Sequence, residues 1–333
     1  MNQTQCIAAE TSVLDISYNI VRSLHIIFGI IVLILLVKVI VSYKTKSVKL
    51  HQNLIQRIIK ILISSVFFLN ALFAISFIVG SVKNFIVLFT YFDPCDCLTQ
   101  VWLVYLIRIP AYIYTTGSPL FHFAIMIERI IATIFVKIYE YQGKKIGIVG
   151  TIIVWSLMLM FGTYVYLSSI IDIDIISHQM VYLSLTSIYN ANVFIVLHYL
   201  LLFLVICIAI ADYFLIYRNK KIKSNFSVIT YSLSQSYQAK QNILVMKIIF
   251  PLDFSYTFVF ALFNLLSSFI RSKREEDIIL NYVKSIDGLS LLLSFHIILT
   301  LIVYDYFLKK QNNLNKNFIK MNMNLYSDRL WNS

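Results

Sequence analysis

The residues most capable of chemistry in this sequence are charged side chains placed inside long apolar runs. Glu128 and Arg129 are adjacent near the end of an apolar stretch that begins near Val101, and about twenty apolar residues suffice to cross a membrane. A charge at that depth is costly, so it is usually placed at a helix end, paired with another charge or used in function. An ion pair that is held in one state and released in another is a two-state element. The pair is therefore a candidate switch, and the alternative is a pair whose long side chains simply reach interfacial water.

Other charged residues also lie within apolar runs. Arg108 lies about two helical turns from one end of its run, and Asp287 about one turn from the end of another. Either these two residues line a pocket or they form a buried structural ion pair, because charges inside a membrane usually pair or face a cavity. Asp253 lies in the middle of a run, where the sequence names no partner, and is a further pocket candidate. Asp212, near the end of its run, is a candidate second partner for Arg129.

The sequence contains no pattern typical of an enzyme. Cys95 and Cys97 are separated by one residue, whereas the ligands of a zinc site are separated by two to four. The histidines are scattered, and neither a phosphate-binding loop nor a nucleophile elbow is present. We therefore expect no catalytic residue, no metal site and no cofactor.

The composition is that of a membrane protein. The mean hydropathy is +0.79; 59% of residues are hydrophobic and 13% are charged, whereas soluble domains are near one half and one quarter. Phe and Tyr are abundant while Gly and Pro are few, which favours helices over the alternating strands of a barrel. The net charge of +12 does not indicate a nucleic-acid partner, because the basic residues are divided among short loops.

Apolar runs predict an all-α bundle of seven transmembrane helices, with the lipid bilayer as its surroundings. The predicted spans are residues 24–43, 58–81, 101–135, 146–171, 192–217, 243–270 and 283–308. Basic loops alternate with acidic or balanced ones, so the positive-inside rule places segment 1–23 outside and the tail 309–333 inside. The basic inner loops either set this topology alone or also dock an acidic partner or anionic lipid.

Several residues outside the charged set have expected structural roles. Cys6, Cys95 and Cys97 all fall on the predicted outer side, which is oxidising, and we expect Cys6 to pair with Cys95 or with Cys97. Asn2 begins an Asn-Gln-Thr glycosylation pattern, which a chance tripeptide explains equally well. Pro251 is expected to kink the sixth span, because its ring clashes with the preceding turn and removes a hydrogen bond.

Several short motifs resemble a known family in the same order along the whole chain. The run from His122 to Thr133, followed by Tyr139-Glu140 and Gly143, resembles the third span and second inner loop of nematode serpentine chemoreceptors, the Sra class and its Srab relatives. The stretch Leu233–Asn242 before the sixth span, and Arg108-Ile109-Pro110 after the Pro94–Cys97 loop, resemble the same group.

The resemblance implies a G-protein-coupled receptor in the plasma or ciliary membrane of a sensory neuron. Such a receptor couples an extracellular small-molecule cue, as in olfaction, to a heterotrimeric G protein inside the cell. Glu128 and Arg129 match the acidic residue and arginine of rhodopsin-like receptors, and ligand binding would move the sixth span about Pro251. The second span lacks Asp and Glu, and the seventh ends in Tyr304-Asp305-Tyr306-Phe307, so the sodium site of rhodopsin-like receptors is not carried over. Pairing with a second receptor stays open.

Two other functions are compatible with a multi-span chain. A ligand-gated channel subunit of the insect odorant-receptor kind has seven spans in the opposite orientation. A small transporter would show internal repeats and helices broken by glycine, which this chain lacks. Membrane orientation distinguishes the receptor from the channel subunit.

Overall fold

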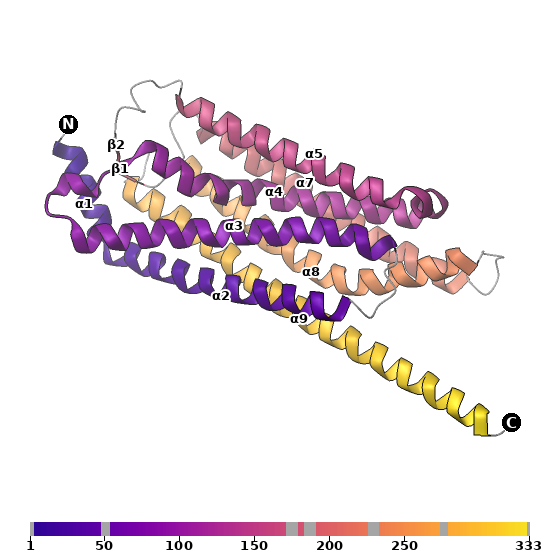
Figure 1. Ribbon diagram of the computed structural model, residues 1–333. Helices are drawn as coiled ribbons and strands as arrows, with labels where there is room; N and C mark the ends of the chain where they lie inside the picture. The colour runs from indigo at the N-terminus through magenta and orange to yellow at the C-terminus, as the bar shows by residue number, and fades with distance from the viewer. Residues whose placement is uncertain are drawn as a thin grey trace.

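The chain folds as a bundle of long helices, seen side-on in a computed structural model (Figure 1). The structure describes residues 3–47, 54–170, 179–182, 191–225, 233–273 and 279–331. Its α-helices are α1 (Gln3–Leu14), α2 (Ile16–Ser47), α3 (Leu54–Thr90), α4 (Val101–Ile134), α5 (Val136–Ile170), α7 (Ala191–Asn225), α8 (Leu233–Ser272) and α9 (Ile279–Trp331). At one end of the bundle β1 (Thr99–Gln100) pairs antiparallel with β2 (Gln179–Met180).

Seven of the described helices are long and apolar enough to cross a membrane. The shortest apolar stretch has 21 residues, and about 20 residues cross the hydrocarbon core. The stretches are Ile16–Ser42, Ile61–Thr90, Val101–Ile134, Lys145–Leu167, Asn192–Arg218, Leu252–Ser272 and Ile279–Phe307. The predicted all-α bundle with seven spans is thus confirmed, and the direction in which the chain enters the membrane stays a prediction.

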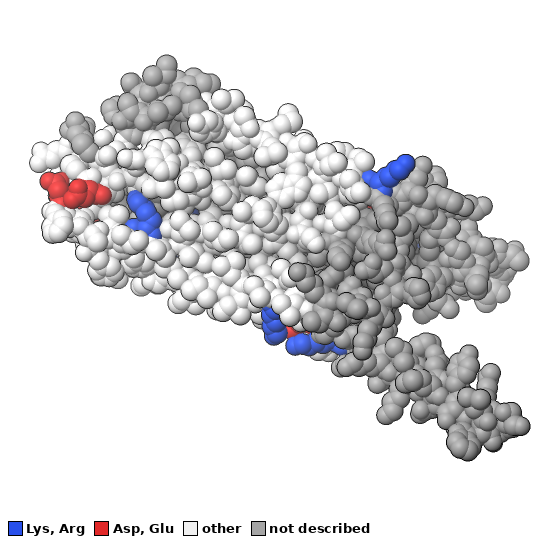
Figure 2. Space-filling view, viewed as in Figure 1, with Lys and Arg blue, Asp and Glu red and all other residues white. Residues whose placement is uncertain are grey.

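The outward surface of the bundle is apolar, as contact with lipid requires. In the view of Figure 2 the charged side chains, blue and red, gather toward the two ends, and the surface between them is white, which marks uncharged residues. On α5, large side chains such as Ile152, Leu159 and Met160 are exposed. The helices therefore present a hydrophobic belt to their surroundings and keep most charge at the ends or inside.

Three helix ends extend beyond the predicted spans. The first apolar helix begins at Ile16, before the predicted start at residue 24, and Tyr18 and His25 are buried in the bundle. α3 continues to Thr90, past residue 81, and α9 continues to Trp331, past residue 308. The predicted outer segment 1–23 consequently contains α1 and the first turns of α2.

α4 occupies the centre of the bundle. It packs against α3, α5, α7 and α8, and 56% of its apolar window is buried, the largest share among the seven spans. Tyr114 and Phe121 of α4 join one continuous core with Phe73 of α3 and Phe260 of α8. Polar side chains on α4 can therefore reach several neighbouring helices.

Glycines permit close helix contacts at two places. A Cβ atom on Gly117 of α4 would collide with Met158 Sδ of α5 and would lie 3.0 Å from Leu69 Cδ1 of α3. A Cβ atom on Gly29 of α2 would lie 2.6 Å from Ile78 Cγ1 of α3. Small residues at such positions let helix backbones approach closely in membranes, so a larger side chain at either glycine would force Met158 or Ile78 to move.

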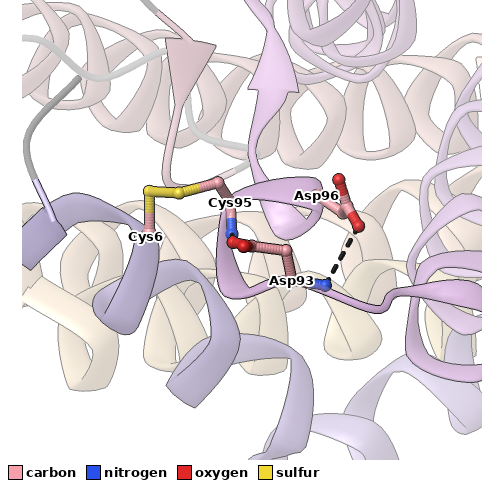
Figure 3. The surroundings of a disulfide bond; sticks show 4 residues. All are labelled: Cys6, Asp93, Cys95 and Asp96. Atoms are coloured by element: carbon pink, nitrogen blue, oxygen red, sulfur yellow. Dashed lines mark hydrogen bonds between the residues drawn. A yellow bond between two sulfur atoms is a disulfide. The ribbon is translucent and has the colours of Figure 1, made fainter.

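A disulfide between Cys6 and Cys95 ties α1 to the loop between α3 and α4 (Figure 3). The loop forms the short 3-10 helix η1 (Pro94–Cys97). Asp93 Oδ1 accepts from the backbone N–H of Cys95 at 2.8 Å, and Asp96 Oδ2 accepts from the N–H of Asp93 at 3.1 Å. These reciprocal caps satisfy donors at the start of η1 and hold Cys95 beside α1. Cys6 is predicted to pair with Cys95 or with Cys97, and the structure pairs it with Cys95.

Asp15 caps α2 directly after α1 ends. Its Oδ1 accepts from the backbone N–H of Tyr18 at 2.6 Å and from the Ser17 hydroxyl at 2.7 Å, and Lys284 Nζ lies 3.5 Å from Oδ2. Partial burial alone would raise the pKa of Asp15, but these hydrogen bonds and the Lys284 charge together lower the pKa below its usual value. The ionised carboxylate is therefore the form that joins α2 to α9.

We expect Asp15→Asn to remove a pH-dependent part of the stability. Because the pKa of Asp15 is lower in the folded protein, its contribution is present above the unfolded pKa of about 4 and is lost as pH falls through the folded pKa. Asn is also a good N-cap, so the loss at neutral pH should be small, about 1 kcal/mol or less. Thermal unfolding from pH 2.5 to 6 checks this. Lys284→Met should weaken the same pH dependence, whereas identical profiles for wild type and Asp15→Asn would contradict it.

We expect Cys6→Ser to release α1 from η1. Closing an 89-residue separation restricts the unfolded chain, and disulfides typically contribute about 2–4 kcal/mol. Limited proteolysis should show new cleavage in α1, and the unfolding temperature should fall. Cys97→Ser, at a buried free thiol in the same loop, is the matched control and should leave the protease map unchanged. An unchanged map for Cys6→Ser would show that the disulfide does not hold α1.

Candidate functional site

A buried ion pair joins two helices near the α1 end of the bundle. Arg108 Nη2 of α4 lies 2.6 Å from Asp287 Oδ2 of α9, and the Tyr18 hydroxyl of α2 donates to the same oxygen at 2.6 Å. Both charged side chains are almost fully buried. Arg108 lies about 10 Å and Asp287 about 12 Å along their helices from the ends at which those helices begin. One carboxylate therefore holds three helices together at membrane depth.

The backbone of Asp287 takes part in the same contact. Its carbonyl oxygen lies 3.0 Å from Nε2 of His25 on α2, and the Ser290 hydroxyl donates to that oxygen at 2.6 Å. The His25 ring stacks on Phe77 of α3 with the ring centroids 4.2 Å apart. The guanidinium of Arg108 lies 5.0 Å from the centroid of Phe77. Aromatic and polar groups from α2 and α3 thus surround the ion pair on several sides.

The ion pair lines a cavity of about 50 Å³. The cavity walls come from α3, α4, α7, α8 and α9, and most of them are apolar or aromatic. The lining residues are Phe73, Phe77, Arg108, Ala111, Tyr112, Thr115, His198, Phe263, Ser267, Arg271, Val283, Ile286, Asp287, Leu289, Ser290 and Leu293. Arg108 and Asp287 therefore form an ion pair and also line a pocket, so the two alternatives set out for them coexist.

Arg271 is a cavity residue that the sequence analysis does not identify, because charged residues typical of a loop follow it closely in the sequence. It lies in the last turn of α8 with 4% of its surface exposed. Its Nε donates to Ser267 Oγ at 3.3 Å, Nη1 to the Tyr282 hydroxyl at 3.1 Å and Nη2 to the Tyr112 hydroxyl at 3.4 Å. The guanidinium also lies 4.9 Å from the ring centroid of Phe194. The signal that could have revealed it is a run without charged residues, 254–270, that ends directly before it.

A second polar cluster lies deeper along α4. His122 Nδ1 is 2.8 Å from Asp253 Oδ1 of α8, and the His122 ring stacks on Tyr256 at a centroid distance of 3.7 Å. The carboxyl of Asp212 on α7 lies within hydrogen-bond reach of Asp253. The structure thus supplies the partner that the sequence could not name for Asp253, and it places Asp212 against Asp253.

Glu128 and Arg129 form the third polar group on α4. Arg129 Nε lies 2.9 Å from Glu128 Oε2, and each residue has 1% of its surface exposed. This burial is incompatible with a pair that reaches interfacial water. The pair lies about 30 Å along α4 from Arg108, so the cavity and the buried Glu128–Arg129 pair occupy opposite halves of the bundle.

The remaining predicted residues contribute less to the site. α8 continues as a helix through Pro251, and the surroundings of its ring lie outside the described residues. Asn2 also lies outside the described residues. Cys97 is a buried free thiol packed with Ala9 and Val13 of α1. Within the ranges that the structure describes, no group of three or more His, Cys, Asp or Glu side chains is placed to hold a metal ion.

Comparison with known proteins identifies the family. A family model described as "Serpentine type 7TM GPCR receptor class ab chemoreceptor" matches residues 4–332. The chain belongs to the serpentine class ab chemoreceptors. A search of curated proteins found no match. The family is a receptor family, so the class ab assignment agrees with the expectation of a chemoreceptor. It also decides between the two classes that the sequence resembles, in favour of Srab over Sra.

In this class ab chemoreceptor, we expect single charge reversals at the ion pair to be strongly destabilising. Arg108→Asp or Asp287→Arg leaves like charges buried, and breaking a buried pair costs about 3–5 kcal/mol. Surface expression, measured by flow cytometry, should fall for each single variant and recover in the double reversal. The apolar double variant Arg108→Met with Asp287→Leu leaves no unpaired charge and should also recover. Failure of both double variants would show that the pairing does not account for the single losses.

Proposed function

We propose that this class ab chemoreceptor couples an extracellular small-molecule cue to a heterotrimeric G protein. The observation that carries the proposal is the division of α4 between two sites. Arg108 lines a cavity in one half of the bundle, and the buried Glu128–Arg129 pair lies about 30 Å away in the other half. A receptor of this kind needs a pocket and a switch that share one structural element, and α4 carries residues of both.

The proposed orientation places the α1 end of the bundle outside the cell. The disulfide between Cys6 and Cys95 lies at that end, and disulfides persist in oxidising compartments. Exposed cations occupy the opposite half, among them Lys145, Arg218 and Lys309, as the positive-inside rule expects for the cytoplasmic side. The cavity would then face outward, and the multi-pass receptor would lie in the plasma or ciliary membrane of a sensory neuron.

The proposed switch is the release of Arg129 from Glu128. In the described conformation both side chains are enclosed, so Arg129 is not presented to a partner at the inner face. The cluster of His122, Asp253 and Asp212 links α4, α8 and α7 between the cavity and this pair. A ligand would favour the release of Arg129 only if it binds the released state more tightly than the state in which Arg129 is paired with Glu128. The G protein would bind the state in which Arg129 is released.

A ligand-gated channel subunit is the second candidate, because it also has seven spans. It would have the opposite orientation, with the α1 end inside the cell. The family match supports the receptor, and so does the disulfide at the α1 end. Orientation therefore decides between the two candidates.

The first experiment is epitope accessibility in intact and permeabilised cells. We expect a tag before Met1 to be labelled without permeabilisation and a tag after Ser333 to be labelled only after it. The disulfide end would then be outside, as the receptor requires. The reverse labelling would exclude the receptor orientation and support the channel subunit.

Variants of the Glu128–Arg129 pair test coupling to a G protein. Arg129→Ala should lower basal nucleotide exchange on a co-expressed Gα subunit by about tenfold or more, since coupling between sites spans roughly 5- to 150-fold. Glu128→Gln, which removes the carboxylate that holds Arg129, should raise it. Ile127→Ala, on the exposed side of the same turn, is the control. A fall in exchange for both Arg129→Ala and Glu128→Gln would indicate a purely structural pair.

A further inference from the structure

The charges around the cavity are unequal. Two guanidinium groups, those of Arg108 and Arg271, line it, and Asp287 is the one carboxylate among the described lining residues. Two more cations lie in the same half of the bundle. Arg22 is buried and donates to the Ser12 carbonyl at 3.1 Å, and Lys83 donates to the Thr99 hydroxyl. Carboxylates such as Asp15 and Asp93 also lie at this end of the bundle, so the excess of positive charge belongs to the cavity lining itself, which favours a negatively charged guest over a positive one.

One aromatic residue, Tyr112, joins the helix that carries Arg108 to the guanidinium of Arg271. Tyr112 is one turn along α4 from Arg108, so the two side chains share a helix face. The Tyr112 hydroxyl accepts from Arg271 Nη2 at 3.4 Å, and all three residues line the cavity. Arginine N–H groups lie in a planar fork that matches the two oxygens of a carboxylate. An acid group entering beside Tyr112 would meet donors from both α4 and α8.

The rest of the wall suits a short hydrocarbon group. Phe73, Phe77, Phe263 and Leu293 contribute apolar surface from α3, α8 and α9. A neutral amide could accept from a guanidinium group, but it would lack the attraction between opposite charges that offsets a carboxylate's lost water, and an ammonium group would face two cations. The small volume of about 50 Å³ favours a guest of a few carbon atoms.

We propose that the cavity binds a small organic acid, with its carboxylate held between Arg108 and Arg271 and its hydrocarbon part against Phe73, Phe77 and Phe263. The proposal rests on the proposed receptor function in one respect, because it takes this cavity as the site that binds the cue. It names the chemical class of the cue, and direct binding tests it without a G protein.

The test uses the full-length protein purified in lipid nanodiscs at pH 7.4. The probes are sodium salts of straight-chain acids from acetate to hexanoate, the corresponding amides and the corresponding primary amines, with sodium chloride matching the ionic strength. We expect the unfolding temperature to rise with acid concentration, and not with amide or amine. Because this readout contains no G protein, loss of G-protein coupling leaves it unaffected.

Variants of Arg271 locate the binding. Arg271→Gln should weaken the apparent affinity for the best acid by roughly tenfold to a hundredfold, as expected for losing hydrogen bonds to a charged group. Arg271→Lys keeps the charge without the planar fork, so it should give an intermediate loss and covers the case in which Arg271→Gln does not fold. Arg218→Gln, an exposed arginine in the opposite half of the bundle, is the matched control and should bind as wild type does.

Three outcomes would overturn the proposal. Stabilisation of the wild type by amides or amines as strong as that by acids would show that the cavity does not select an anion. Stabilisation by acids that is unchanged in both Arg271 variants would place the binding elsewhere. Absence of stabilisation by every acid in the series would show that the cavity does not bind short acids.

Discussion

The arrangement of this receptor depends on the cost of placing a carboxylate in a membrane interior. An ionised group there requires partners from the protein itself, and Asp287 obtains them from Arg108 on α4 and Tyr18 on α2. Three helices distant in sequence are thereby fixed at one level of the bundle. The cavity lies at the same level because both members of the ion pair form part of its wall. The ion pair that joins the helices therefore also forms part of the proposed binding site.

α4 organises polar groups at three depths. Arg108 comes first, His122 follows about 21 Å along the helix, and Glu128–Arg129 lies about 10 Å beyond His122. At each level the α4 residue meets a charged partner, from α9 for Arg108, from α8 for His122 and within α4 itself for Arg129. α8 contacts α4 at two depths, through Arg271 and Tyr112 beside the cavity and through Asp253 and His122 deeper in the bundle. Displacement of α8 against α4 would therefore change polar contacts at both depths.

The features that follow from solvation can be predicted from the sequence, whereas those that follow from packing cannot. Length and hydropathy suffice for seven spans, and a charge inside an apolar run is conspicuous, so Arg108 and Asp287 are recognisable from the sequence alone. The His122–Asp253 contact joins residues 131 positions apart, and only the relative rotation of two helices decides it. Arg271 resembles a loop residue because its sequence neighbours beyond Ser272 are charged, whereas helix α8 carries it into the interior. The burial of Tyr18 and His25 on α2 likewise depends on packing against neighbouring helices.

α9 continues without interruption from the ion pair to the far end of the chain. It has 53 residues and is therefore about 80 Å long, and Figure 1 shows its last part extending well past the other helices. The portion from Asp287 to Trp331 is a lever arm of about 66 Å at the usual rise per residue. For a rigid helix, each degree of tilt at Asp287 moves Trp331 by about 1 Å at that length. For a rigid α9, a tilt of about three degrees at the ion pair would thus displace the end of the helix by about 3 Å, which is comparable to an atomic diameter.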